Sequence, residues 1–328
     1  MDRESALAAR WEAERPMYEA WGAFVSRQIE DGVSEVISPA SVETFFKIPI
    51  TYRTKNEPSL LAKAFHRKKA YSNPYDDIED KVGVRVVVLF GDDIRTVENV
   101  VQSHDKWTAE KARDYESERF LRPYEFDYQS LHYVVRSKSA IRWNDIDITE
   151  GLSCEVQIRT LLQHAYSELT HDTIYKPNVA AEPDVKRAAA KSMALIEATG
   201  DYFTQVKAKL ARAAAPGQKV AITLGRLYGE LMGGPGEPSA LNSMIVDHYR
   251  KWAKEDFDED IARFVRSKGW LASRIAERSP TQLLYRQPGV LLVYWAIAQA
   301  RTMAAKDSPL SDDELSLLYS DLGYRLPS

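Results

Sequence analysis

The stretch from Gly151 to Lys176 constrains the fold most, because its residue pattern changes period at Thr160. From Leu152 to Arg159 apolar and polar residues alternate, which is the period of a strand with one buried face. After Thr160 the apolar residues recur every four positions, as on one stripe of a helix. The sequence therefore predicts a strand with one polar face that leads directly into a helix.

The polar face of that strand carries Glu155, Gln157 and Arg159, which are an acid, an amide and a base in one row. A solvated edge strand would give the same alternation. An acid, amide and base in register are what a lined pocket requires, and this interpretation is the one favoured here.

The following helix carries His164, Glu168, His171 and Tyr175 on another stripe, at spacings of four, three and four. Two histidines and a glutamate could ligate zinc, but the carboxylate lies between the histidines and no Cys-x-x-Cys pair is present. A hydrogen-bonded helix face is the simpler interpretation, and we expect no zinc.

Composition narrows the class of protein. The 328 residues suffice for two unequal domains, and a net charge of -4 gives no overall attraction to nucleic acid or to an anionic membrane. The one cysteine, Cys154, lies on the apolar face of the strand, which favours a core thiol in a reducing cytoplasm. No secretion signal precedes the first helix, and the apolar run 290–300 is too short to span a bilayer, so we expect no membrane association.

A basic cluster stands out in this acidic chain. Between Lys47 and Lys69 there are seven Lys or Arg and one acid. A predicted strand over 45–52 is followed by a predicted helix to about residue 70. The strand end, the helix start and one helix face carry Arg53, Lys55, Ser59 and Lys63, an arrangement suited to gripping phosphates.

An acidic segment precedes the β-branched run 86–90, which we expect to be a central strand. Asp76 and Asp77 suit helix capping. Asp80 is the better candidate to hold Mg²⁺ beside phosphates, because Mg²⁺ prefers one or two carboxylates together with substrate oxygens.

The remaining pattern completes an α+β architecture. We expect an amphipathic helix over 4–31 covering the sheet, a helix over 92–103, an irregular charged region over 104–127 and a strand over 128–136 that places Tyr128, Ser130 and His132 on one face. A Tyr at that strand's mouth could stack on a base, although aromatic residues are more often part of the core. A long helix over about 184–213 ends near Ala215-Pro-Gly, and helices without recognisable chemistry follow.

Five blocks of residues occur in the order found in one family. They are Arg53-x-Lys55-x-x-x-Ser59-x-x-x-Lys63, Asp80-x-x-Gly83-x-Arg85, Tyr128-x-Ser130-x-His132, Glu155-x-Gln157-Ile-Arg159-Thr160, and His164-Ala-Tyr-x-Glu168-x-x-His171 with Tyr175-Lys176. Over roughly residues 40–180 the chain resembles the synthetase domain of RelA/SpoT-type alarmone synthetases. No hydrolase domain precedes this region, so it is similar to the small, stand-alone members.

This resemblance implies a mixed β-sheet flanked by helices, a nucleotidyltransferase-like fold. It also implies transfer of the β,γ-pyrophosphate of ATP to the 3′-hydroxyl of GDP or GTP, with release of AMP. The ATP-binding residues would be Arg53, Lys55, Ser59, Lys63 and Arg85. Asp80 and Glu155 would be catalytic and bind Mg²⁺, with Glu155 also taking the proton of the attacking hydroxyl. Tyr128 would stack on the acceptor base, with His132 and Gln157 near the acceptor.

One departure concerns the acceptor. The family commonly has Gly directly before the stacking Tyr, and this chain has Asp127. Asp127 could accept hydrogen bonds from a guanine edge, which favours a free nucleotide. A toxic branch of the family pyrophosphorylates the tRNA 3′ end or makes adenosine alarmones. Five cations upstream of Asp127 could neutralise a tRNA end, and these are Lys106, Lys111, Arg113, Arg119 and Arg122.

The expected organisation has three parts: residues 1–39 as a helix packing on the synthetase domain, 40–213 as that domain, and 214–328 as a helical extension. We expect the extension to regulate the enzyme or to bind a protein partner or a second copy of the chain. A different class of function is an inactive nucleotide-sensing module, against which the intact pair of Asp80 and Glu155 argues.

Overall fold

The computed structural model describes residues 2–37, 41–66, 71–127, 129–170 and 182–327. It divides into two compact units, Met1–Val206 and Lys207–Ser328, each with its own hydrophobic core. The three functional regions expected from the sequence, 1–39, 40–213 and 214–328, stay a prediction.

The first unit is built around a five-stranded sheet in the order β1-β2-β7-β4-β3. The strands are β1 (Phe46–Thr54), β2 (Val82–Val88), β7 (Ser153–Thr160), β4 (Leu131–Ser137) and β3 (Trp107–Arg113). The β2–β7 pair is parallel, while β1–β2, β4–β7 and β3–β4 are antiparallel. The predicted mixed sheet flanked by helices is therefore confirmed, and the predicted strand at 152–159 is the central one.

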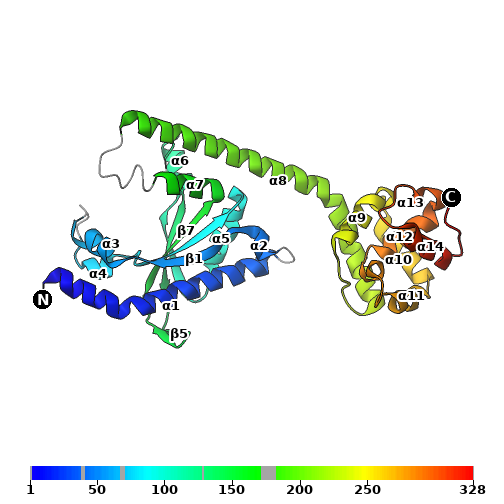
Figure 1. Cartoon of the computed structure of the whole chain (residues 1–328), viewed down its shortest axis with the longest axis horizontal. Helices are drawn as coiled ribbons and strands as arrows, with labels where there is room; N and C mark the ends of the chain where they lie inside the picture. Colours follow the sequence, from blue (N-terminus) through cyan, green and yellow to red (C-terminus); the bar gives the residue numbers. More distant parts are fainter. Residues whose placement is uncertain (1, 38–40, 67–70, 128, 171–181, 328) are drawn as a thin grey trace. The chain divides into compact units, whose positions relative to one another are not determined.

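The sheet divides the unit into an apolar and a polar side. On β7 the side chains of Cys154, Val156 and Ile158 are fully buried. They face the side on which α1 (Arg3–Ile37) and α5 (Gly91–Ser103) pack (Figure 1). The expected helix at 4–31 thus forms and covers the sheet. The alternation in the sequence arises because the opposite side of β7 holds the polar row.

Shorter elements complete the first unit. These are α2 (Val42–Phe45), α3 (Glu57–Leu61), the π-helical turn η1 (Ala62–His66), α4 (Pro74–Asp77), α6 (Tyr115–Leu121), α7 (Leu161–Thr170), β5 (Ile141–Trp143) and β6 (Ile146–Ile148). β5 and β6 form a hairpin whose turn residues Asn144 and Asp145 have positive φ angles of 47° and 62°. Asn and Asp tolerate this conformation better than most residues.

The prediction of an irregular region over 104–127 is wrong. This region holds β3 and α6. β3 is an edge strand with charged residues along it, as edge strands often have, and this composition hides the alternation. Trp107 anchors β3, because its buried ring packs edge-on against Trp21 of α1 at 6.2 Å between centroids.

The predicted end of the long helix near Ala213 is also wrong, because α8 runs from Pro183 to Met232 through Pro216. A proline removes one helical hydrogen bond and usually breaks a helix. Here residues 211–216 are exposed, so water can solvate the freed carbonyl groups. Arg250 also donates to the carbonyl oxygen of Ala213 at 3.3 Å. Buried Val220 and Leu224 stabilise the continuation of the helix.

The second unit is helical, as expected. After α8 come α9 (Ala240–Tyr249), η3 (Arg250–Trp252), α10 (Phe257–Ser267), α11 (Leu271–Arg278), η4 (Leu283–Arg286), α12 (Val290–Gln299), α13 (Arg301–Ala305) and α14 (Asp312–Asp321). The apolar run is α12, and its residues 290–297 are all buried. Among the described residues, every helix is too short or too polar to cross a bilayer.

A close approach between α1 and the sheet gives a first prediction. A Cβ at Gly22 would lie 2.7 Å from Val82 Cγ2 and 2.9 Å from Tyr52 Cβ. We expect Gly22→Ala to lower the free energy of unfolding by about 1–2 kcal/mol, because overpacking outweighs the gain in helix propensity. Urea unfolding monitored by circular dichroism measures this.

Gly200→Ala is the matched control, since Gly200 lies in α8 and a Cβ there would meet nothing within 4 Å. It should raise the free energy of unfolding by up to about 1 kcal/mol. Equal effects of the two substitutions would contradict the tight packing of α1 on the sheet.

Candidate active site

The candidate site begins with a row of residues across three strands. Arg53 of β1 pairs with Gly83 of β2, and Gly83 pairs with Glu155 of β7. Residues paired across neighbouring strands point to the same face of a sheet. A Cβ at Gly83 would meet only the Glu155 carbonyl oxygen, at 3.6 Å. A glycine with no side chain therefore stands between Arg53 and Glu155 in this row.

A second row lies two residues further along the same strands. Arg85 of β2 pairs with Gln157 of β7, which pairs with His132 of β4. Because the side-chain period of a strand is two, this row shares its face with the first. Five residues predicted for the site from four sequence blocks thus lie side by side on the polar face: Arg53, Arg85, His132, Glu155 and Gln157.

Glu155 is held by both neighbours. His132 Nδ1 lies 2.9 Å from Glu155 Oε1, and Gln157 Nε2 donates to Glu155 Oε2 at 2.8 Å. Burial raises the pKa of the Glu155 carboxyl, but the hydrogen bonds from His132 and Gln157 outweigh it, so the pKa lies below its ordinary value. Glu155 is therefore ionised at neutral pH and able to accept a proton.

Arg159 fixes the amide of Gln157. Arg159 is 2% exposed, and its guanidinium donates to Gln157 Oε1. Since the amide oxygen faces Arg159, the amide nitrogen faces Glu155. The acid, amide and base row expected from the sequence is thus one hydrogen-bonded chain along β7.

Asp80 lies just before β2 and contacts two lysines. Its Oδ2 is 3.1 Å from Lys55 Nζ and 2.7 Å from Lys63 Nζ. Burial raises the pKa of the Asp80 carboxyl, but Lys55 and Lys63 outweigh this effect, and the pKa lies below its ordinary value. The Asp80 charge in turn acts to raise the pKa of Glu155, so the two carboxylates lie within electrostatic range of each other.

The helix that carries Lys63 is capped at the site. Asn56 Oδ1 accepts from the backbone N–H of Ser59 at 2.9 Å, and Pro58 occupies the first turn. The chain then continues as the π-helical turn Ala62–His66, a geometry that often occurs at functional sites. Ser59 itself is exposed.

Lys81 is a site-forming residue that sequence reasoning missed. Its side chain is 2% exposed, and its ammonium donates to the carbonyl oxygens of Tyr75 and Ile78, both at 2.6 Å. Burial lowers the pKa of the Lys81 ammonium to about 8. The Lys81 carbonyl accepts from the N–H of Lys55 at 2.8 Å. Lys81 therefore fastens the segment before Asp80 to the strand end that carries Lys55. A lysine beside an acid gives no sequence signal of burial.

Several predicted residues lie outside the described ones. They are Tyr128, His171, Tyr175 and Lys176, so base stacking by Tyr128 stays a prediction. Ser130 is fully buried and donates to the Ile158 carbonyl at 3.4 Å. Asp127 is exposed, and its predicted contact with a guanine edge also stays a prediction.

The helix face at His164 is described in part. His164 Nδ1 lies 3.6 Å from Glu168 Oε1, beyond hydrogen-bonding distance, and Glu168 pairs with Arg85 at 3.3 Å. Burial, Arg159 and Arg85 lower the pKa of His164. Within the described ranges, no group of three or more His, Cys, Asp and Glu side chains is arranged around a common metal position.

The five cations upstream of Asp127 are each paired with a carboxylate. Lys106 pairs with Asp105, Lys111 with Glu98 and Asp114, Arg113 with Glu118, Arg119 with Glu197, and Arg122 with Glu125, at 2.8–3.3 Å. This surface therefore carries acids and bases in about equal number. Binding of a tRNA end by these residues stays a prediction.

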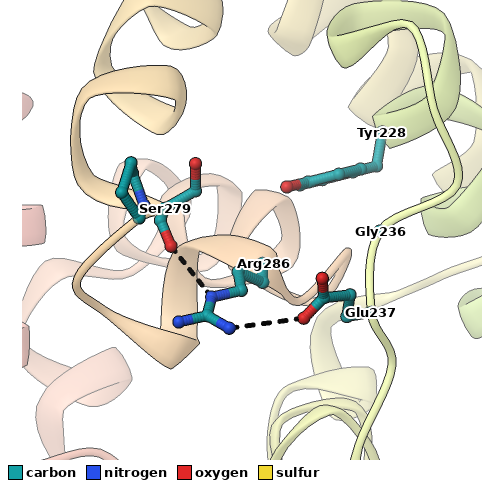
Figure 2. Close-up of a pocket in the computed structure, with 6 residues that line it drawn as sticks. Tyr228, Gly236, Glu237, Ser279 and Arg286 are labelled. Atoms are coloured by element: carbon teal, nitrogen blue, oxygen red, sulfur yellow. Dashed lines mark hydrogen bonds and ion pairs between the residues drawn. The ribbon is translucent and has the colours of Figure 1, made fainter.

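A hollow of about 420 Å³ lies in the second unit and is shown in Figure 2. Its charged side chains, Arg286 and Glu237, form an ion pair at 3.4 Å, and Arg286 also donates to the Ser279 carbonyl oxygen at 2.9 Å. The sequence-predicted catalytic residues all belong to the first unit. We therefore assign no chemistry to this hollow.

Comparison with known proteins identifies the region that holds the site. Residues 52–180 match the family model described as a region found in RelA / SpoT proteins. This confirms the resemblance drawn from the five sequence blocks.

Two curated relatives are GTP pyrophosphokinases of Bacillus subtilis (strain 168). The chain is 31% identical to YwaC over 103 residues, which are 31% of this chain and 45% of YwaC. It is 25% identical to YjbM over 166 residues, which are 51% of this chain and 74% of YjbM. The match thus spans less than half of the length of YwaC.

Solved structures show the same fold. The crystal structure of small alarmone synthetase 1 from Bacillus subtilis aligns with a TM-score of 0.51 at 20% identity, covering 62% of this chain and 99% of that one. The structure of the same synthetase bound to its product pppGpp aligns with a TM-score of 0.50 at 21% identity, covering 62% and 99%.

The helix cap at the site gives a second prediction. Asn56→Ala removes the cap of the helix that presents Ser59 and Lys63, and should lower the free energy of unfolding by about 1 kcal/mol. It should also weaken binding of a non-hydrolysable ATP analogue, measured by isothermal titration calorimetry, because the two side chains lose their fixed positions.

Ser41→Ala is the matched control. Ser41 caps α2 by accepting from Glu43 N at 3.2 Å, and α2 carries none of the site residues. It should lower stability similarly and leave analogue binding unchanged. Equal loss of binding in both variants would show that general stability, and not the cap at the site, governs the affinity.

Proposed function

Because residues 52–180 are a RelA/SpoT-type region, we propose that this chain is an ATP-dependent pyrophosphokinase. It transfers the β,γ-pyrophosphate of ATP to the 3′-hydroxyl of GDP or GTP and releases AMP. The proposal rests on one observation, the grouping of two carboxylates with their partners. Glu155 is held by His132 and Gln157, and Asp80, within electrostatic range of it, contacts Lys55 and Lys63.

The donor side is the set of cations around Asp80. Lys55 and Lys63 supply compact positive charges for phosphate oxygens, and Arg53 and Arg85 add guanidinium groups from neighbouring strands. Ser59 adds a hydroxyl at the helix start. Together these groups would hold the triphosphate and stabilise the charge that develops on the bridging oxygen as AMP leaves.

The acceptor side is the set of groups around Glu155. In the reaction the 3′-oxygen of the acceptor bonds to the β-phosphorus, and the bond from that phosphorus to the oxygen shared with the α-phosphate breaks. AMP leaves with that oxygen. Glu155 takes the proton of the 3′-hydroxyl, since its lowered pKa keeps it ionised, and His132 keeps its carboxylate oriented.

The carboxylate oxygens of this site are suitable ligands for Mg²⁺. Asp80 Oδ1 is buried and has no hydrogen-bond partner among the described residues, and Glu155 is a second carboxylate within electrostatic range. One or two carboxylates completed by phosphate oxygens is the arrangement that Mg²⁺ prefers in nucleotide sites. Asp80 and Glu155 would hold the ion, which when bound neutralises phosphate charge and polarises the reacting phosphoryl group.

Two observations favour a guanosine nucleotide as acceptor. The relatives YwaC and YjbM are both GTP pyrophosphokinases. The five cations that could have bound a tRNA end are paired with carboxylates, so the surface upstream of Asp127 offers little net attraction to a polyanion. Transfer to tRNA or to an adenosine nucleotide, as in the toxic branch, is the alternative outcome of the first assay below.

The remaining functional expectations stay predictions. They are the cytoplasmic location, and the binding of a protein partner or a second copy of the chain through residues 214–328. The inactive sensing module also stays as a contrasting hypothesis, and it predicts no AMP when an acceptor is added to ATP and Mg²⁺.

The acceptor is identified by a third prediction. ATP labelled at the γ-phosphate is offered with GDP, GTP, ATP and tRNA in parallel, and we expect label on GDP and GTP together with stoichiometric AMP. If the label appears on tRNA alone, the proposed alarmone synthesis is wrong and the tRNA-modifying toxin activity is supported. Absence of AMP with every acceptor would favour the sensing module.

The catalytic carboxylates give a fourth prediction. Asp80→Asn and Glu155→Gln should each leave a folded protein whose transfer rate falls by roughly a hundredfold or more. Thermal unfolding supplies a second measurement: Mg²⁺ should increase the stabilisation by a non-hydrolysable ATP analogue in the wild type, and much less in Asp80→Asn.

Asp145→Asn is the matched control, because the Asp145 side chain is 98% exposed in the β5–β6 turn. It should keep both the rate and the Mg²⁺ effect. A rate near that of the wild type in Asp80→Asn or Glu155→Gln would remove that residue from the mechanism.

A further inference from the structure

The segment between α6 and β4 lies next to the proposed acceptor groups in sequence, because Ser130 and His132 follow it directly. Gln129 ends this segment, and its side chain is 7% exposed. Its amide nitrogen donates to Glu197 Oε2 of α8 at 3.0 Å, and its amide oxygen accepts from Gln163 Nε2 of α7 at 3.4 Å. Both ends of a buried amide are therefore satisfied by helices that lie far away in the sequence.

The same carboxylate holds the other end of the segment. Glu197 Oε1 pairs with Arg119 of α6 at 3.1 Å, and the Glu197 side chain is 21% exposed. Glu197 thus spans from Arg119, just before the segment, to Gln129 at its end. In Figure 1 the first half of α8 lies beside α6, in agreement with this ion pair.

The contact continues to the central strand. Gln163 Oε1 accepts from the backbone N–H of Thr160 at 2.8 Å, and Thr160 ends the strand that carries Glu155 and Gln157. A single line of hydrogen bonds therefore connects β7, α7, the segment before β4, and α8.

We propose that Glu197 is a positioning residue for the acceptor. This inference rests on the proposed function. By fixing Gln129 and Arg119, Glu197 sets the path of the chain that enters β4, and hence where the acceptor meets His132 and Glu155. Within the described part of the chain, the contacts of Glu197 are with Gln129 and Arg119 and not with the donor-side groups Lys55, Lys63 and Asp80, so its effect should fall on the acceptor and not on ATP.

The energetics favour the Gln129 contact as the effective one. Arg119 is 46% exposed, so its ion pair is screened by solvent and contributes little. If the buried amide of Gln129 loses its acceptor, its unsatisfied N–H group destabilises the folded state by the full cost of desolvation. The alternative is that the segment moves until water reaches the amide. Movement of the segment is the change that would alter acceptor binding.

The position of Glu197 also has a consequence for control of the enzyme. α8 continues beyond Val206 into the second compact unit. A change in the position of α8 would therefore also move Glu197.

The test compares Glu197→Ala, Glu197→Gln and Glu230→Ala in the full chain. Glu197→Ala removes both contacts, whereas Glu197→Gln keeps an oxygen that accepts from Gln129. Glu230→Ala is the control, because it breaks an ion pair of the same helix with Arg226, at 2.6 Å, in which both side chains are about half exposed. KM for GDP and KM for ATP are measured separately, and GDP binding is measured by isothermal titration calorimetry.

For Glu197→Ala we expect KM and Kd for GDP to rise about tenfold, the effect of one lost hydrogen bond to a charged group, with KM for ATP unchanged. Glu197→Gln should recover most of the GDP affinity, and Glu230→Ala should match the wild type. Circular dichroism shows whether Glu197→Ala folds. If it does not, the double variant Arg119→Ala with Glu197→Gln takes its place. In that variant Gln129 keeps its hydrogen-bond acceptor, so we expect the GDP affinity to fall by less than threefold.

Equal changes in the GDP and ATP constants, or no change in either, would overturn the role of Glu197. So would a replacement double variant whose GDP affinity falls tenfold, since the exposed ion pair would then be the effective contact. A wild type that transfers to no acceptor would instead refute the proposed function. The GDP titrations would still decide whether Glu197 governs nucleotide binding, and a wild type that binds no GDP would overturn both.

Discussion

The register between β2 and β7 is the constraint on which the site depends. Gly83 is paired with Glu155 and Arg85 with Gln157, and the antiparallel partner β4 then brings His132 against Gln157. A slip by one residue would turn every side chain of a strand to the opposite face. Such a slip would bury Glu155 and Gln157 against α1 and α5 and expose Cys154 and its apolar neighbours. The burial of the apolar side of β7 therefore fixes the chemistry of its other side.

Charge balance around Asp80 follows from this arrangement. Two lysines contact one carboxylate oxygen, so the group carries one net positive charge and is attractive to phosphate. Each of the three side chains is only about a fifth exposed. Burying charges to this extent costs free energy unless they are paired, and the mutual contacts offset that cost in the ligand-free protein. A bound triphosphate would take over the lysines and leave Asp80 available as an oxygen ligand. The contacts with Asp80 thus reduce the repulsion between the two lysine ammonium groups.

The sequence predicts the parts of this structure that follow a local period, and misses those that depend on distant contacts. Alternation identified the central strand and its polar row, and the apolar stripe identified α1. Ordered motif blocks predicted Lys55, Lys63, Asp80 and Glu155 as site residues, and in the structure Lys55 and Lys63 both contact Asp80. By contrast, β3 has no clean alternation because it is an edge strand, and α8 passes through Pro216 because packing in the second unit outweighs the local preference. Lys81 and Glu197 look like ordinary surface charges in the sequence, since burial of Lys81 and bridging by Glu197 arise only when separate segments meet.

The electrostatics of the acceptor side bear on how an acceptor can be recognised at all. Long-range attraction of a polyanion requires a surplus of positive charge over a surface. The charged residues on β3, α6 and the segment before Asp127 are instead balanced by carboxylates such as Glu118 and Glu125. Under the proposed function, recognition there would rest on short-range contacts, namely hydrogen bonds to base edges and stacking, which act only when the contacting groups hold fixed positions. A segment without its own core can be fixed only by contacts from outside, and Glu197 provides two of them. Under the proposed function, the balanced surface charge and the contacts of Glu197 would together favour selection of a small acceptor by geometry and not by charge.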